Sequence, residues 1–316
     1  MFLNYRKFII IYLFISFCII SKVIIAVEPK EKGYLNIGDA KLYYQTFGNG
    51  EPIIILHGGP GLGFGYLLPQ MLQLSSTHEL IFYDQRGSGK SLHTSINEQT
   101  INMKRFIADL DALRKDLGYK KITLLGHSWG GLLAMNYAIA YPQNVRAMIL
   151  ANSAPASRAE FIKFITEYDK RTKPISDELH KMHDSPQFMS GDPETIKKYY
   201  SLIFSTYFAD PDDVEELSLQ QTPLAALNGF KVASIMQKTY LSNQFNLLPA
   251  LAKLKVPTLI IHGAEDLVPL SSDEQINNAI INSQLLLIED CGHFPYIEQP
   301  TVFFTVIENF LKENDA

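Results

Sequence analysis

The residues best suited by type and spacing to do chemistry lie around Ser128, in the run Gly126-His127-Ser128-Trp129-Gly130. An apolar, strand-like segment precedes this G-x-S-x-G run, and a segment with helical spacing follows it. So tight a turn needs small residues on both sides of the serine, and it lifts the hydroxyl over the sheet edge. The positive end of the following helix points to the same place. The sequence therefore predicts that Ser128 is a nucleophile whose hydroxyl attacks a carbonyl carbon.

A serine hydroxyl is a weak nucleophile, so it needs a base that is oriented by an acid. In a strand–turn–helix context, the acid and then the base follow the serine along the chain. A predicted strand over residues 257–262 leads to Glu265 and Asp266, and another over residues 284–288 leads to His293. We predict Asp266 as the acid, with Glu265 as the alternative, and His293 as the base.

The other histidines fit different roles. Three lie in turns or at strand ends and are predicted to be structural: His57, His127 and His262. Four lie in polar segments and are predicted to face solvent: His78, His93, His180 and His183.

A glycine-rich turn over residues 57–61 follows a fully apolar segment. Its backbone N–H groups can face a reaction centre, and we predict that the N–H of Gly59 and that of Trp129 form an oxyanion hole. A glycine-rich turn of this kind can alternatively bind the phosphates of a nucleotide. Residues 89–91 do read G-K-S, but no glycine stands four residues before Gly89, so the sequence argues against nucleotide binding.

Strand-like and helix-like segments alternate on either side of a long helical stretch. This alternation predicts an α/β fold with a mostly parallel sheet and helices on both faces. A hairpin is expected over residues 34–47, and buried strands are expected over residues 52–56, 80–83, 121–125 and 145–151. Helices are expected over residues 103–117 and 129–140, and near residues 300–313.

Residues 154–251 are richer in charge and have helical spacing, with helices expected over residues 159–168, 193–208 and 224–241. We interpret this stretch as a helical cap inserted into one core domain, which is formed by residues 27–153 and 252–316. Insertions of this kind lie over the edge of the sheet where α/β proteins bind ligands.

Residues 1–26 have the features of a targeting segment. They contain Arg6, Lys7 and Lys22, no acidic residue, and a long apolar run that ends before Ala26. We predict a signal peptide and an exported protein, periplasmic or secreted. The alternative is an uncleaved N-terminal anchor, in which case this segment alone would contact a membrane.

Composition narrows the remaining classes of function. The chain has 316 residues, 47% of them hydrophobic, and a formal net charge of −5, which is typical of a globular protein and unfavourable for nucleic-acid binding. Of the two cysteines, Cys18 lies in the targeting segment and Cys291 remains alone, so a cysteine-based metal site is not expected.

Five motifs occur in an ordered set: H-G-G-P-G at residues 57–61, D-Q-R-G-S-G-K-S at 84–91, G-H-S-W-G-G at 126–131, G-A-E-D-L-V-P at 263–269 and C-G-H-F-P at 291–295. Together they resemble the α/β-hydrolase superfamily, and more narrowly its proline iminopeptidase (prolyl aminopeptidase) branch. The resemblance covers residues 33–152 and 251–311 and is weak across the insertion.

The resemblance implies an α/β-hydrolase fold in which Ser128, Asp266 and His293 form the catalytic triad. It also implies oxyanion donors at Gly59 and Trp129, a loop-shaping role for residues 84 and 86, and no metal or organic cofactor. The expected activity is that of a proline iminopeptidase-like aminopeptidase, which releases N-terminal residues from short peptides through an acyl-enzyme.

Two other functions stay open. A carboxylic-ester hydrolase, esterase or lipase-like, would use the same triad, and a non-catalytic binding protein on this fold is the remote alternative. The expected partner is accordingly a small peptide, amide or ester, and no nucleic acid.

The insertion departs from the branch it resembles. Members that hold a substrate's α-ammonium group use glutamates of the cap, usually beside tryptophans, whereas the only tryptophan here is Trp129. The glutamates of the insertion match no such pattern and are expected on solvated helix faces: Glu160, Glu167, Glu194, Glu215 and Glu216.

Overall fold

The computed structural model describes residues 27–315, so the targeting segment predicted over residues 1–26 lies outside the described residues. The core is one eight-stranded sheet in the order β1-β2-β4-β3-β5-β6-β7-β8. The strands are β1 (Glu31–Asn36), β2 (Lys41–Phe47), β3 (Pro52–Leu56), β4 (Glu79–Tyr83), β5 (Ile122–His127), β6 (Val145–Ala151), β7 (Thr258–Gly263) and β8 (Ser283–Ile288). Only the pairings of β2 with β1 and with β4 are antiparallel.

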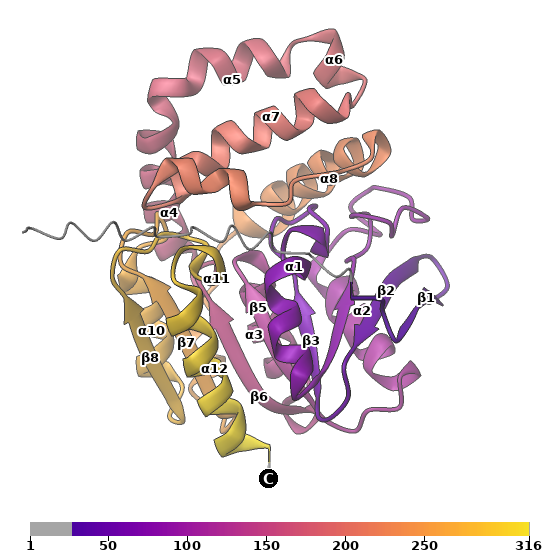
Figure 1. The fold of residues 1–316 in the computed structure, drawn as a ribbon, viewed down its shortest axis with the longest axis vertical. Helices are drawn as coiled ribbons and strands as arrows, with labels where there is room; N and C mark the ends of the chain where they lie inside the picture. The colour runs from indigo at the N-terminus through magenta and orange to yellow at the C-terminus, as the bar shows by residue number, and fades with distance from the viewer. Residues whose placement is uncertain (1–26, 316) are drawn as a thin grey trace, which may run out of the picture.

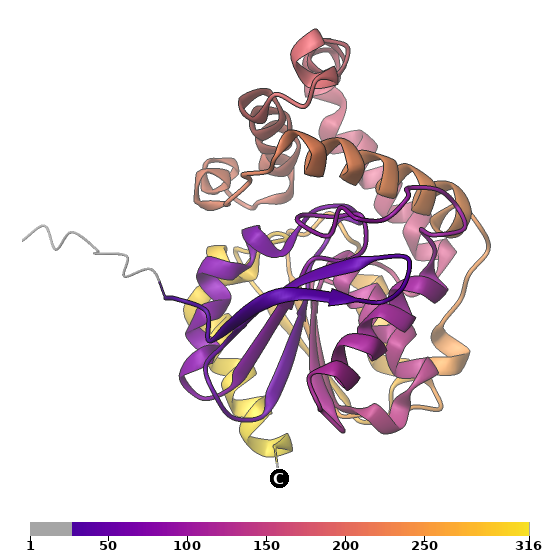
Figure 2. The same ribbon diagram turned by 90° about the vertical axis from the view of Figure 1, so that its right-hand side faces the viewer.

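Helices cover both faces of this sheet (Figures 1 and 2). One face carries α2 (Met103–Asp116), α3 (Trp129–Ala140) and α10 (Leu270–Ala279), and the other carries α1 (Leu68–Met71), α11 (Pro295–Glu298) and α12 (Pro300–Asn314). This confirms the prediction of a mostly parallel α/β sheet with helices on both faces.

The sequence of β3 explains why both faces are covered. Successive side chains of a strand point to opposite faces, so an uninterrupted apolar run has no face that suits water. Ile54 and Leu56 pack in the cluster that includes α2 and α3, while Ile53 and Ile55 pack in the cluster that includes α12. All four side chains are fully buried.

Between β6 and β7 the chain forms a cap of helices that lies over the carboxyl edge of the sheet (Figure 1). Its helices are α4 (Arg158–Thr172), α5 (Ser176–His183), α6 (Pro186–Met189), α7 (Pro193–Phe204) and α8 (Pro223–Met236). The chain then returns to the core through the short helix α9 (Leu248–Leu251), which packs against α3 and α10. Side-chain caps fix several starts: Ser157 accepts the N–H of Glu160 at α4, and Asp192 accepts that of Thr195 at α7.

Two expectations of burial are wrong. His78 is buried, because its ring nitrogens meet Thr77 Oγ1 and Asp315 Oδ2, both at 2.8 Å. Glu160 is also buried and does not lie on a solvated face, because its carboxylate meets Lys163, Ser271 and Gln275. Both residues lie at contacts between segments far apart in the sequence, which local polarity does not reveal.

Across residues 27–315, no helix has the length and apolarity needed to cross a membrane. The same residues contain no cluster of histidine, cysteine and carboxylate side chains able to hold a metal ion.

Candidate active site

Ser128 occupies the sharp turn between β5 and α3. Its backbone has φ 56° and ψ −123°, in a region that few residues other than glycine adopt. The flanking glycines are required by close packing: a Cβ on Gly126 would overlap the carbonyl of Gly130, and one on Gly130 would overlap that of Leu56. The turn therefore holds the serine at the sheet edge in a strained conformation, as expected for a nucleophile elbow.

The structure brings His293 and Asp266 together from loops after β8 and β7. His293 Nδ1 lies 2.9 Å from Asp266 Oδ1 and 3.0 Å from Oδ2. The alternative acid, Glu265, is exposed, and among residues 27–315 it makes hydrogen bonds through its backbone alone. Asp266, not Glu265, is thus the acid that can orient the imidazole.

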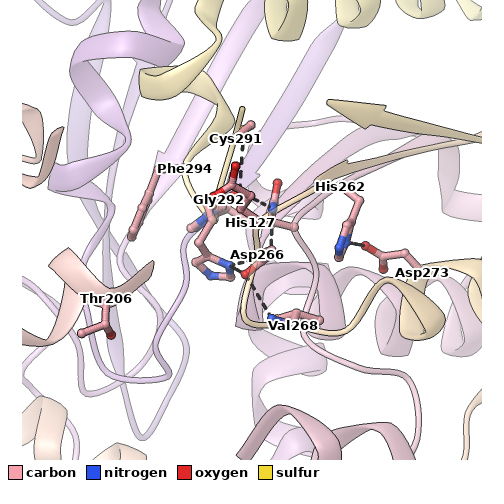
Figure 3. Close-up of polar contacts among 12 residues, drawn as sticks. His127, Thr206, His262, Asp266, Val268, Asp273, Cys291, Gly292 and Phe294 are labelled. Atoms are coloured by element: carbon pink, nitrogen blue, oxygen red, sulfur yellow. Dashed lines mark hydrogen bonds and ion pairs between the residues drawn. The ribbon is translucent and has the colours of Figure 1, made fainter. Parts of the chain in front are cut away.

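The carboxylate of Asp266 is held by further donors. Asn152 Nδ2 donates to Oδ2 at 2.8 Å, and the backbone N–H of Val268 donates to Oδ1 at 3.1 Å (Figure 3). Burial acts to raise the pKa of Asp266, but His293, His262 and the hydrogen bond from Asn152 outweigh it and hold that pKa below its usual value. The carboxylate is therefore kept ionised beside the imidazole.

Ser128 and His293 both line one cavity of about 440 Å³ beneath the cap. Gly59 and Trp129 line it as well, and neither of their N–H groups donates a hydrogen bond to another residue in the range 27–315. No hydrogen bond within that range joins the serine hydroxyl to the imidazole; in many enzymes such bonds shorten only when substrate binds. The five residues predicted for chemistry are thus gathered at one rim of the sheet.

A buried chain of hydrogen bonds connects the glycine-rich turn to the histidine loop. The N–H of Gly58 donates to Tyr66 Oη at 2.7 Å, and Tyr66 Oη lies 2.8 Å from His127 Nδ1. His127 Nε2 lies 2.9 Å from the carbonyl oxygen of His293. Burial lowers the pKa of His127 to about 3, so its ring is neutral. A neutral ring that donates from Nε2 must accept at Nδ1, so the hydroxyl of Tyr66 donates to it.

Sequence reasoning missed Asn152 and Tyr66. Asn152 adopts φ 45°, a conformation that asparagine tolerates better than most residues, and its amide also donates to the carbonyl of Gly292 at 2.9 Å. The only local signal was a polar residue directly after the apolar run of β6. Tyr66 follows the glycine-rich turn but has no pattern of its own.

Two further residues near the predicted triad, Cys291 and His262, are buried. Cys291 is fully buried, and burial raises the pKa of its thiol well above the usual value, which disfavours the reactive thiolate form. His262 lies at the end of β7 and pairs with Asp273 of α10, at 2.8 Å between Nδ1 and Oδ2, away from the cavity (Figure 3).

The cap side of the cavity is mainly aromatic. Tyr200 stacks on Phe204 and on Phe230, with ring centroids 5.6 and 5.5 Å apart. The other cap residues that line the cavity are Phe161, Phe164, Ile165, Tyr168, Tyr199, Ile203, Tyr207, Ala233, Ser234, Gln237 and Leu241. No aspartate or glutamate is among the described residues that line the cavity.

These features fit a match to the alpha/beta hydrolase fold family over residues 51–300, and the chain belongs to that family. A proline iminopeptidase of Clostridium botulinum is 27% identical over 298 residues, which cover 90% of this chain and 99% of that protein. A proline iminopeptidase of Saccharolobus solfataricus is 28% identical over 296 residues, which cover 90% and 93%.

Among solved structures, a proline iminopeptidase of Mycobacterium smegmatis superimposes with a TM-score of 0.65 at 20% identity, covering 90% of this chain and 99% of that chain. At this identity the likeness concerns the fold alone. The family and its proline iminopeptidase relatives therefore agree with the resemblance carried by the sequence motifs.

Proposed function

We propose that the chain is a serine hydrolase that works through an acyl-enzyme, with Ser128 as nucleophile, His293 as base and Asp266 as its orienting acid. The observation that carries this proposal is the geometry of the rim. A strained turn presents Ser128 to the same cavity that the Asp266-bound imidazole of His293 lines. This is the arrangement that acyl transfer through a triad requires.

The reaction follows from these positions. Nδ1–H of His293 donates to Asp266, which leaves Nε2 free to take the proton of Ser128 as its Oγ bonds to the carbonyl carbon. The N–H groups of Gly59 and Trp129 stabilise the oxyanion, and one such donor is worth roughly 3–4 kcal/mol of barrier. The leaving group then takes the proton from His293 as its bond to the acyl carbon breaks. Water repeats the attack and releases the acid.

For the substrate, the first candidate is the N-terminal residue of a short peptide. It is supported by the relatives named proline iminopeptidase, which match about 90% of this chain. Such a substrate carries a positive α-ammonium group next to the reacting carbonyl, and a buried cation is costly unless an acid pairs with it.

The second candidate, a carboxylic ester or amide with an uncharged acyl group, is favoured by the cavity itself. None of its described lining residues is acidic. The helix α4 lines the cavity, and both of its glutamates form ion pairs: Glu160 with Lys163, and Glu167 with Lys170 and Arg171. An aromatic wall with no acid suits an apolar acyl group better than a cation.

A substrate panel separates the candidates. Purified protein is assayed with prolyl 4-nitroanilide, its N-acetyl derivative and 4-nitrophenyl esters of increasing acyl length, with Ser128→Ala as the control. Turnover that requires the free amine supports the aminopeptidase. Equal or faster turnover of N-acetyl compounds or esters excludes a requirement for the amine and supports the second candidate. The third hypothesis, a non-catalytic binding protein, survives only if a fluorophosphonate fails to label Ser128.

A further inference from the structure

The loop that carries His293 is held by the carboxylate of Glu298, at the end of the one-turn helix α11. Glu298 Oε2 accepts the N–H of Gly292 at 2.8 Å, and Oε1 accepts that of Phe294 at 2.9 Å. These two N–H groups flank His293 on either side. The carboxylate therefore fixes the backbone immediately before and after the imidazole-bearing residue.

The same carboxylate also binds the cap. Glu298 Oε2 accepts the N–H of Ala209 at 2.8 Å, in the cap segment that follows α7. The N–H of His293 itself donates to the carbonyl of Tyr207 at 2.9 Å. A Cβ on Gly292 would overlap that carbonyl, so glycine is needed for the two backbones to approach. The cap thus contacts the loop that carries His293 through backbone atoms, and the Glu298 carboxylate accepts hydrogen bonds from both segments.

Helix capping does not account for this arrangement. A glutamate near the start of a helix often binds the N–H of the N-cap residue, which here is Phe294. Helix capping does not require bonds to the N–H groups of Gly292 and Ala209 as well. Burial raises the pKa of Glu298 above its usual value, although the three N–H donors act against that rise. The protein thus keeps a half-buried carboxyl group here and meets it with three backbone dipoles.

We propose that Glu298 is a positioning residue, which sets the imidazole of His293 opposite Ser128 and couples that position to the cap. This inference rests on the proposed role of His293 as the base. A displacement of about 1 Å at a reacting group can cost on the order of 100-fold in rate. The three hydrogen bonds that Glu298 accepts form a clamp on the histidine loop. Loss of this clamp should consequently slow the chemical step.

The test uses a fluorophosphonate, because its reaction with Ser128 needs the base but no knowledge of the substrate. The second-order labelling rate is measured for wild type, Glu298→Gln, Glu298→Ala and the control Glu289→Gln. Glu289 is exposed, close in the sequence, and bonded to no other side chain in the described part of the chain. Glutamine keeps one oxygen acceptor but turns an NH₂ group toward one N–H, so it should lose part of the clamp.

We expect labelling to slow about 10-fold in Glu298→Gln and about 100-fold in Glu298→Ala, with the Glu289 control unchanged. Thermal melting is recorded for each variant, and labelling is measured well below the melting temperature. A purely structural role would lower the melting temperature and leave the rate alone. Labelling of Glu298→Ala within twofold of wild type would overturn the inference, whereas a wild-type protein that does not label would instead overturn the proposed function.

A second variant isolates the contact with the cap. Ala209→Pro replaces the N–H that meets Glu298 with a ring carbon, which cannot approach the carboxylate oxygen as closely, so it breaks this contact with the cap and keeps the glutamate side chain itself. The extended ψ of 153° at Phe208 is compatible with a following proline. We expect labelling to slow about threefold to tenfold, less than in Glu298→Ala. A wild-type rate in Ala209→Pro would overturn the coupling to the cap.

Discussion

The two walls of the cavity are held in different ways. On the core side, directional hydrogen bonds fix the carboxylate and the imidazole: Asp266 receives bonds from His293, Asn152 and Val268. On the cap side, aromatic rings such as Tyr200 and Phe204 contact one another, and the wall is mainly apolar. Hydrogen bonds depend steeply on angle and distance, whereas apolar contact is non-directional. If the proposed function is right, this difference predicts that the core wall carries the chemistry and the cap wall carries the choice of substrate.

The largest expected effect comes from breaking the core wall alone. Ser128→Ala removes the proposed nucleophile, and we expect kcat to fall on the order of 10⁵–10⁶-fold. Binding of substrate should persist, because the cap wall is untouched. Single-turnover kinetics with the best substrate of the panel measures the loss of catalysis, and calorimetric titration with the same substrate measures binding. If binding were lost together with catalysis, the division between the walls would be wrong.

A subtler change to the core wall removes one hydroxyl. Tyr66→Phe leaves the buried N–H of Gly58 and Nδ1 of His127 without their partner. We expect kcat to fall about 10–100-fold, because the glycine-rich turn that carries the proposed oxyanion donor Gly59 should shift. We also expect the free energy of unfolding to fall by about 1–3 kcal/mol.

The matched control is Tyr296→Phe. The ring of Tyr296 also packs against His127, with centroids 5.4 Å apart, but its buried hydroxyl has no hydrogen-bond partner among the described residues. Removing that hydroxyl should leave kcat unchanged and should not destabilise the fold. Equal losses in the two variants, measured by ester turnover and urea unfolding, would show that the Tyr66 bonds have no special part.

The sequence was informative where the signal is local. The G-x-S-x-G turn, the buried strand β3 and the strand–helix alternation each depend on neighbours within a few residues, and the fold followed from them. The prediction of long helices in the insertion also matches α4, α7 and α8, with ends that differ by a few residues.

What the sequence could not supply are contacts between distant segments. Asn152 meets Asp266 across 114 positions and Gly292 across 140, and the N–H of Ala209 meets Glu298 across 89. Nothing in the spacing of an asparagine or a glutamate predicts such a partner. For the same reason, the sequence wrongly predicted that Glu160 in the cap faces solvent: its partners Ser271 and Gln275 lie on another helix, α10.

A change in the cap wall should move specificity and leave the chemistry intact. Phe204→Ala removes a ring that stacks on Tyr200 and contacts Phe294. We expect kcat/KM for a bulky acyl ester to fall about 10–100-fold, in line with the 1–3 kcal/mol that a hydrophobic pocket supplies. Turnover of a 4-nitrophenyl acetate should change less than threefold. Met189→Ala, at an exposed cap position, is the control. A uniform loss across acyl lengths would contradict the division of labour.

The smallest effect on activity is expected at the pair of His262 and Asp273, which is buried behind the core wall. Burial acts to lower the pKa of His262, but the hydrogen bond and charge of Asp273 outweigh it and raise that pKa. The folded protein therefore binds this proton more tightly than the unfolded chain. The stabilisation is complete below the unfolded pKa of about 6.5 and is lost as pH rises through the higher folded value.

We therefore expect His262→Gln to lower the free energy of unfolding at pH 6 by about 1.5–3 kcal/mol, the range for a hydrogen bond to a charged group. The gap to wild type should narrow toward pH 9, and kcat should stay close to wild type at both values. Urea unfolding at the two pH values measures the gap, with His93→Gln as the control because His93 is exposed and makes no ion pair with another residue in the range 27–315. A gap that stays constant with pH would mean that packing, and not the shared proton, joins β7 to α10.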